Sequence, residues 1–234
     1  MRTRTQTLQA FVLILSFLQL CHSFTLTGTV RDFKDNHPDF EKYNGAELGI
    51  IADQLGADMK PVYKGGQGLK TSGKANFDQW FNDVDGVNTK TQLTIELVDT
   101  DGDGIYSYSS SAFFPIDNQL FGNQGRNHNF HFTFELHTKF TYEAGQIFSF
   151  TGDDDIWVFI NGQLMIDLGG THGPLTGSVE LDKLGLTIGN TYALDFFFAE
   201  RHTDGSNFIM ETSIELKTDP CAVKRAAKKL LQSN

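Results

Sequence analysis

Three consecutive carboxylates, Asp153, Asp154 and Asp155, are the residues whose type and spacing point most directly to chemistry. Adjacent acids repel one another and form strands poorly, so placing them beside the apolar run Ile156–Ile160 requires either free solvation or a bound cation. Ca²⁺ suits such a cluster because it takes about six to eight oxygen ligands of mixed kinds. The acids are too crowded for the carboxyl pair of a glycoside hydrolase, whose members stand roughly 5–9.5 Å apart. The triplet therefore favours a calcium site over a catalytic one.

The alternation of side chains along a strand limits how the three acids can act together. In a regular strand Asp153 and Asp155 share one side and Asp154 faces the other. Asp153 and Asp154 can face one ion only if the backbone leaves the strand conformation, as a cis peptide between them would do. We therefore expect these two side chains to converge and Asp155 to be an outer hydrogen-bond acceptor.

A polar loop at residues 200–207 is the natural source of further ligands. Asp204, Asn207 and main-chain carbonyl groups of this loop offer oxygen atoms of the kinds that calcium accepts. If coordination positions remain open, vicinal hydroxyl groups of a sugar could fill them. The loop therefore extends the predicted site from a metal centre to a ligand-binding surface.

Three basic side chains could line the rim of this site: His172, Arg201 and His202. Arg201 could equally form a structural ion pair with an acid of the cluster. His172 and His202, with an Asp, could instead make a transition-metal site, which would favour an enzyme. The chain has no nucleophile elbow, zincin helix or phosphate loop, so we expect no enzymatic activity.

A second acidic motif, Asp99-Thr100-Asp101-Gly102-Asp103-Gly104, has the alternating spacing with which calcium loops of the EF-hand type begin. The twelfth position is Ser110 rather than Glu, and the preceding Leu93–Val98 alternates like a strand, not a helix. We interpret the motif as a solvated turn, and a separate weak calcium loop stays open as the alternative.

Short alternating strands must position these acids. Ile156–Ile160 has strand length, Asn161-Gly162 favours a type I′ turn, and Gln163–Leu168 is the return strand. In Asn129–His137 the aromatic residues share one face and His131, Thr133, Glu135 and His137 the other, polar face. Further strands are expected at 24–31, 146–150, 179–181, 184–188, 192–198 and 208–216. Short helical pieces are expected at 39–43 and 47–55, with another capped by Asn76. This pattern predicts an all-β fold, an antiparallel β-sandwich with short helical insertions.

The two ends of the chain differ from this domain, which we place at residues 24–218. Residues 1–23 have the form of a secretory signal peptide, because Arg2 and Arg4 precede an apolar run, Ala10–Leu20, and the segment ends in a small residue. That run is too short to span a bilayer. Residues 219–234 form a short basic tail. We therefore expect a secreted, extracellular protein with no membrane insertion after cleavage.

Charge and cysteine content limit the partners. Residues 1–23 contain two arginines and no acid, so their removal takes the formal net charge from −10 to −12. Nucleic acid is therefore not an expected partner, whereas bound cations are. Cys221 is the one cysteine after residue 23, which allows a disulfide-linked dimer or an unpaired thiol.

Several separate motifs occur in one order along the chain: 113–117, 129–133, 152–161, 167–172, 197–202 and 205–208. This set resembles the fibro-slime domain of secreted slime-mould proteins of the prespore-cell-inducing type, over about residues 24–216. That domain is similar to the jelly-roll-like, protective-antigen-type β-sandwich with which yeast flocculins and related adhesins bind sugars.

The resemblance implies a ligand set and a partner class. In the wider group an Asp-Asp pair joined by a cis peptide holds calcium, and an Asn from a following loop completes the site. Ca²⁺ ligands are thereby implied at Asp153, Asp154 and Asn207, with a glycan or a cell-surface or matrix glycoprotein as the partner. Members often continue into cysteine-rich regions, which are not seen after Cys221, so a matrix-crosslinking role is not expected.

These observations lead to a ranked expectation of function. The first is a secreted, calcium-dependent carbohydrate-binding or adhesion module. The alternative is an extracellular signalling or matrix structural protein in which calcium is purely architectural and the partner is a protein. A metal-dependent enzyme ranks third.

Overall fold

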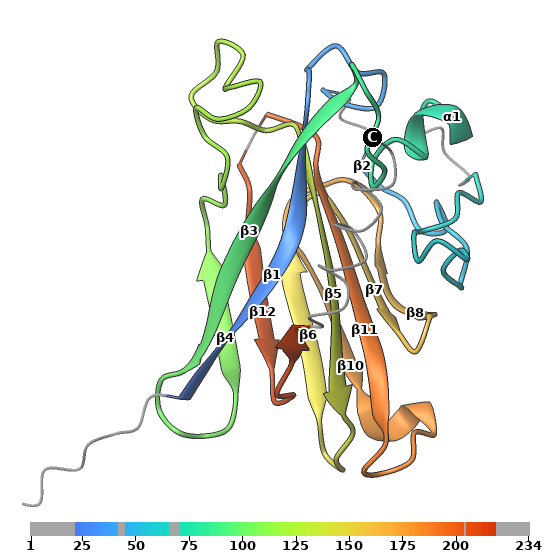
Figure 1. Ribbon diagram of the computed structural model, residues 1–234, viewed down its shortest axis with the longest axis vertical. Coiled ribbons are helices and arrows are strands. Elements are labelled where there is room, and N and C mark those ends of the chain that lie inside the picture. Colours follow the sequence, from blue (N-terminus) through green and yellow to red (C-terminus); the bar gives the residue numbers. More distant parts are fainter. Residues whose placement is uncertain (1–21, 42–44, 66–70, 204, 219–234) are drawn as a thin grey trace, which may run out of the picture.

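A computed structural model describes residues 22–41, 45–65, 71–203 and 205–218 (Figure 1). The basic tail and nearly all of the expected signal peptide lie outside these ranges, as do Asp204 and Cys221. Within the described ranges, no helix has the length and apolar character that crossing a membrane would require.

The regular secondary structure of the described chain is almost entirely β, as its alternating pattern predicts. The strands are β1 (His22–Phe33), β2 (Gly45–Ala46), β3 (Asn88–Asp99), β4 (Tyr106–Ser110), β5 (Phe132–Thr141), β6 (Ile147–Gly152), β7 (Asp155–Ile160), β8 (Gln163–Leu168), β9 (Gly170–Thr171), β10 (Leu175–Glu180), β11 (Thr191–Glu200), β12 (Phe208–Thr212) and β13 (Lys217–Thr218). The helices are α1 (Lys74–Phe77) and a 3₁₀ turn, η1 (Leu181–Leu184). The expected strand at 184–188 is wrong, because η1 and a glycine turn occupy that stretch.

Most of the strands form one continuous antiparallel path, ordered β10-β6-β12-β4-β3-β1-β5-β11-β7-β8. β13 pairs with β5 beside this path, and β2 and β9 form a separate two-stranded sheet. The long strands β1 and β3 run side by side (Figure 1), and β1 pairs with β5 while β3 pairs with β4. The two ends of the path approach each other, since a Cβ on Gly177 of β10 would lie 2.4 Å from Ile166 of β8. The path therefore folds over into two layers, β5-β11-β7-β8 and β4-β12-β6-β10, which confirms the predicted sandwich.

The main core lies between these layers and is rich in phenylalanine. In β11, Phe196 and Phe198 point into it, and Phe196 lies opposite Leu136 of β5 and Val158 of β7. Phe208 of the other layer packs against both Phe196 and Phe198. The alternate residues of β11 and β7 point out of the sandwich. The side chains that alternation in the sequence predicts to point inward thus do point into the main core.

A second apolar cluster covers the outer face of β7 and β11. Trp157 and Phe197 pack there against Trp80 and Phe81 from the segment 45–87, drawn in cyan to green beside β7 and β8 (Figure 1). Strand β7 is consequently buried on both faces, which explains its unbroken apolar run. The covering segment is the main departure from a two-layer sandwich.

Two expectations from the sequence are wrong on this side of the sheet. His131, Thr133 and Glu135 of the presumed polar face are buried rather than solvated. Glu41 lies against His131, the Trp80 carbonyl group accepts from Thr133, and Lys60 lies against Glu135. The described parts of the stretches at 39–43 and 47–55 contain turns and bridges instead of helices, including the Ile51–Tyr63 bridge. In α1 the N-cap is Gly73, and Asn76 lies inside the helix.

Candidate cation site

Sheet register brings the acidic triplet and the polar loop to one place. Residues 153–154 cross from β6 to β7, and residues 201–207 cross from β11 to β12. In one layer Gly152, before the first crossing, pairs with Phe208, which follows the second crossing. In the other layer Asp155, after the first crossing, pairs with Ala199, which precedes the second. The two crossings between layers therefore run beside each other at the same end of the sandwich.

Asp153 and Asp154 are joined by a cis peptide, as the resemblance implies. Asp153 is 7% exposed, and both of its carboxylate oxygens accept hydrogen bonds from Asn207. The backbone N–H of Asn207 donates to Oδ1 at 2.5 Å, and its side-chain Nδ2 donates to Oδ2 at 2.9 Å. Two of the three expected metal ligands, from segments more than fifty residues apart, are thus in direct contact.

Asp154 is 5% exposed and lies between two loops. Its Oδ1 accepts the backbone N–H of His172 and its Oδ2 accepts that of Arg201, each at 3.0 Å. Burial raises the pKa of Asp154 to about 8, although the Arg201 charge and the two N–H groups partly oppose this rise. The site is therefore a place where an isolated negative charge is unfavourable.

Asp155 and Arg201 pair with each other below this surface. Arg201 Nε donates to Asp155 Oδ2 at 2.5 Å, and Gly170 N–H donates to Asp155 Oδ1 at 2.6 Å. The guanidinium also donates to the Asp39 carbonyl and lies 4.6 Å from the Trp80 ring centroid. Asp155 is a hydrogen-bond acceptor, as expected, but it is fully buried instead of lying on the outer side of the site. Of the two alternatives for Arg201 the structure shows the ion pair.

The other predicted rim residues that the structure describes, His172 and His202, donate to nearby acids through their backbone N–H groups. The ring of His172 faces carbonyl oxygens, with Nδ1 2.8 Å from Gly173 O and Nε2 3.2 Å from Leu168 O, so its backbone rather than its ring meets the acids. His202 is half-buried and its backbone N–H donates to Glu200 at 3.4 Å. Asp204 lies outside the described residues.

Glu200 is the acid that sequence reasoning missed. It is 1% exposed, and its Oε2 has no hydrogen-bond partner among the described residues. Burial, together with the charges of Asp154 and Asp153, raises the pKa of Glu200 well above its ordinary value. The signal was present in the pattern, since Phe196, Phe198 and Glu200 share the inward face of one strand, whereas the sequence interpretation assigned Glu200 to the polar loop.

The donor set of this cluster fits calcium. Four buried acids, Asp153, Asp154, Asp155 and Glu200, gather around one cation, Arg201, which is paired with Asp155. The excess of buried carboxylate is unfavourable without a compensating charge. Carboxylate and amide oxygens are the ligands that calcium takes, so Asp153, Asp154 and Asn207 are the residues that would hold it.

Comparison with known proteins identifies the family. Residues 107–225, just over half of the chain, match the PA14 domain. The chain belongs to the PA14 domain family. The match includes the acid cluster, the loop 201–207 and strands β4 to β12.

The relatives of this PA14 domain include proteins of the slime mould Dictyostelium discoideum. Protein psiQ is 42% identical over 196 residues, covering 76% of the chain and 20% of psiQ. Protein psiC is 38% identical over 243 residues, covering 91% of the chain and 47% of psiC. The chain thus spans less than half the length of either relative. The expected resemblance to slime-mould proteins of this type is confirmed.

Solved structures similar to this PA14 domain are more distant in sequence. The PA14 sugar-binding domain of an RTX adhesin is 13% identical, with a TM-score of 0.35, over 82% of the chain and 90% of that domain. The PA14 domain of the MpAFP antifreeze protein is 12% identical with the same TM-score, over 94% of the chain and 89% of that domain.

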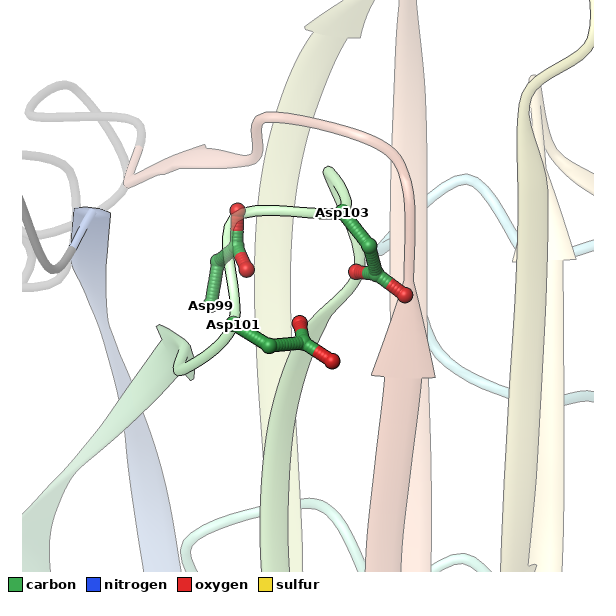
Figure 2. A group of neighbouring side chains, drawn as sticks. All are labelled: Asp99, Asp101 and Asp103. Atoms are coloured by element: carbon green, nitrogen blue, oxygen red, sulfur yellow. The ribbon is translucent and has the colours of Figure 1, made fainter. Parts of the chain in front are cut away.

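The second acidic motif of this PA14 domain forms the turn between β3 and β4 (Figure 2). Oxygens of Asp99, Asp101 and Asp103 lie within 4.8 Å of one another, but Asp101 and Asp103 are exposed. Asp99 Oδ1 accepts the Gly102 N–H at 2.7 Å and Oδ2 accepts the Gly104 N–H at 3.2 Å. These bonds stabilise the turn, in keeping with the interpretation of a solvated turn.

His172 and His202 do not join an acid in a metal-binding group within the described part of the domain, where the Asp99 turn is the one group with three suitably close ligand atoms. Both ring nitrogens of His172 instead face main-chain carbonyls of their own loop. The transition-metal arrangement that would favour an enzyme therefore has no support from the described histidines.

Proposed function

We propose that this PA14 domain is a secreted, calcium-dependent carbohydrate-binding or adhesion module. The observation that carries the proposal is the meeting of the Asp153–Asp154 pair with Asn207, which brings two carboxylates and an amide to one point from separate loops. The buried acids exceed the single buried cation there, Arg201, so a divalent cation would relieve an unfavourable charge.

The position of the site supports an external ligand. Asp153 and Asp154 lie at the end of the sandwich in connections between strands, where binding residues commonly occur on a rigid scaffold. Asn207 is half-buried, so one side of the cluster lies close to solvent. A cation held there could take sugar hydroxyl groups as its remaining ligands, as the resemblance to sugar-binding sandwiches implies.

An open pocket of about 410 Å³ adjoins the same loop. Its lining includes Thr203 and Gly205 of the loop and Arg126, Asn127 and Phe130 from the segment before β5. An aromatic edge, an amide and a guanidinium offer both apolar contact and hydrogen-bond donors, which is the mixture that binding pockets for small polar ligands use. This pocket is the place for the sugar ring that extends beyond the cation.

A glycan array with and without calcium tests this proposal directly. We expect binding to a defined sugar in calcium and loss of that binding with a chelator. Calorimetric calcium titration of the same protein, with Asp154→Asn and Asp153→Asn as site variants, should show one site that both variants lose. Asp101→Asn is the matched control, because it removes an exposed acid from the other acidic turn. A wild-type protein that binds no calcium above background would refute the proposal.

A purely architectural calcium is the second candidate. It is favoured by the hydrogen bonds that already tie Asp153 and Asp154 to Asn207, His172 and Arg201, because an ion at that point would mainly lock the loops together. Calcium binding with no glycan binding, and specific capture of a defined protein partner that chelation does not release, would favour this candidate over the first.

A further inference from the structure

We propose that Glu41 is a specificity-determining residue of the pocket beside the 201–207 loop, and that it makes this pocket select uncharged glycans over anionic ones. The inference rests on the proposed function, since it names the class of sugar that the pocket accepts. Glu41 does not itself line the pocket, but it contacts two residues that do, Thr203 and Arg126. It is therefore a positioning residue, which acts on a ligand through these two side chains.

Glu41 anchors the beginning of the loop through both its main chain and its side chain. Its backbone N–H donates to the carbonyl oxygen of Arg201 at 2.7 Å. The hydroxyl of Thr203 lies 2.6 Å from each of its carboxylate oxygens. A hydrogen bond to an ionised acceptor is roughly twice as strong as one between neutral groups. Glu41 thus fixes the Thr203 wall of the pocket independently of the cis-linked acid pair, which binds the loop at its two ends.

His131 holds the Glu41 carboxylate from the sandwich side. Nε2 of this histidine lies 2.6 Å from Oε1 of Glu41, and its ring is buried just before β5. Burial raises the pKa of Glu41, but the bonds from Thr203 and His131 outweigh this effect and lower it. Burial lowers the pKa of His131 by more than Glu41 raises it, so the ring is neutral at pH 7. The carboxylate is therefore ionised without a compensating charge on the histidine.

Arg126 is the one basic side chain among the described residues that line the pocket, and two acids neutralise it. Its Nη1 donates to Asp35 Oδ2 at 2.9 Å, and its Nε lies 3.6 Å from Glu41 Oε1. The bond from Arg126 lowers the pKa of Asp35, so both acids are ionised at pH 7. One cation thus meets two carboxylates. An anionic sugar would add a further negative charge to this wall, and like charges placed together reject a partner.

The rest of the site suits an uncharged sugar. Asn127 brings an amide, Thr203 a hydroxyl and Phe130 an aromatic edge, which together offer hydrogen bonds and apolar contact. The charges of Asp153 and Asp154 would equal that of one bound Ca²⁺, so an ion held there would not make the surface positive. The surroundings of the pocket consequently offer no excess positive charge to an anionic ligand.

Two variants separate the roles that Glu41 combines. Thr203→Val removes the hydroxyl that Glu41 holds and changes no charge, so it should weaken binding of an uncharged sugar with no gain for anionic ones. Asp35→Asn removes the other acid partner of Arg126 and leaves Thr203 in place. It should keep the affinity for the uncharged sugar and strengthen binding of anionic ones. The ion pair of Asp35 is partly exposed, so its loss should not prevent folding.

The test is a glycan array in calcium that carries each neutral sugar beside its uronic-acid and sulfated forms, with calorimetry of the sugars that bind. The wild type should bind an uncharged sugar and should bind its anionic forms at least about tenfold more weakly. Glu41→Gln should lose about tenfold in affinity for the uncharged sugar, because Thr203 loses its charged acceptor. It should bind the anionic forms more tightly than the wild type does. Its calcium affinity should match the wild-type value, because the acid pair and Asn207 are unchanged.

A wild-type protein that prefers anionic sugars, or a folded Glu41→Gln variant with the wild-type ratio of the two affinities, overturns the inference. If Glu41→Gln does not fold, Asp35→Asn decides the question, and an unchanged ratio in that variant also overturns it. Failure of the proposed function is a different outcome, in which the wild-type protein binds no sugar of either class in calcium.

Discussion

Arg201 and Asp155 form an ion pair, with 2.5 Å between Nε and Oδ2, that no solvent reaches. The pair joins the end of β11 to the start of β7 directly beneath the Asp153–Asp154 peptide. Gly170, Asp39 and Trp80 provide further contacts of the two groups. The acidic site therefore rests on a buried support that is itself neutral in charge.

Removing the cation of this support should be severely destabilising. Arg201→Met leaves Asp155 buried without its partner, and we expect the free energy of unfolding to fall by about 3–5 kcal/mol. Urea unfolding followed by tryptophan fluorescence measures it. Arg126→Met is the control, because its ion pair with Asp35 is partly exposed and should contribute at most about 1 kcal/mol. Equal losses in the two variants would contradict a special role for the buried pair.

The buried network on the outer face of β5 predicts a pH dependence of stability. Burial lowers the pKa of His137, but Asp195 and Glu135 outweigh this effect and raise it to about 9. A raised histidine pKa stabilises the folded state below the unfolded value of about 6.5, and this contribution is lost as pH rises towards 9. We expect the unfolding free energy to decline over that interval.

At acid pH the same network predicts the opposite trend, in which the free energy of unfolding declines as pH falls. Burial raises the pKa of Glu135, but His137, Arg31 and Lys60 outweigh it and lower the pKa to about 2. This contribution is complete above the unfolded value of about 4.5 and is lost as pH falls towards 2. Unfolding curves of wild type and His137→Gln from pH 3 to 9.5 provide the check. The variant should lose the decline on the alkaline side, and an identical decline in both proteins would refute the assignment to His137.

Calcium should stabilise the folded protein through its site. A ligand that binds only the folded state contributes about 2.7 kcal/mol at a concentration of 100 times its dissociation constant. Chemical unfolding in calcium and in a chelator should therefore differ for the wild type and coincide for Asp153→Asn. Asp103→Asn, in the exposed turn of Figure 2, should keep the wild-type difference. A calcium effect that Asp103→Asn removes and Asp153→Asn retains would move the site to that turn.

Gly152, the last residue of β6, lies close to the main chain of Asn207 in the other crossing. A Cβ there would lie 2.5 Å from the carbonyl oxygen of Asn207, so the loop must move to accept Gly152→Ala. We expect a loss of about 1–3 kcal/mol, as for other overpacked sites, together with weaker calcium binding. Gly173→Ala serves as the control, since no atom lies within 4 Å of the added methyl group. Wild-type calcium affinity in Gly152→Ala would show that the position of Asn207 is unimportant.

Local pattern was sufficient for the strands and for part of the site. The alternation of Phe132, Phe134 and Leu136 predicted an inward face because side chains on a strand alternate whatever the rest of the fold does. The acid triplet likewise predicted that Asp155 would be separate from Asp153 and Asp154. The polar loop offered Asn207 as one candidate ligand among several, and the resemblance to the fibro-slime and protective-antigen sandwiches singled it out.

Whether the outer faces of the strands are buried or exposed depended on tertiary structure. Glu135 and His131 have the same alternating pattern as exposed residues, and their face becomes a buried network only because Lys60 lies against Glu135 and Glu41 against His131. The segment 45–87 lacks a regular period, so its path follows from long-range contacts such as those of Trp80 and Trp157 rather than from local preference.

The sequence by itself thus determined the strand content, the sandwich class and the acidic pair, because these follow from local alternation and from adjacent residues. The tertiary structure alone decided that Arg201 supports Asp155 instead of lining a rim, and that Glu200 joins the cluster. The reason is that burial and charge balance depend on which distant segments meet. Here they meet because β6 neighbours β12 while β7 neighbours β11, which brings the two crossing loops together.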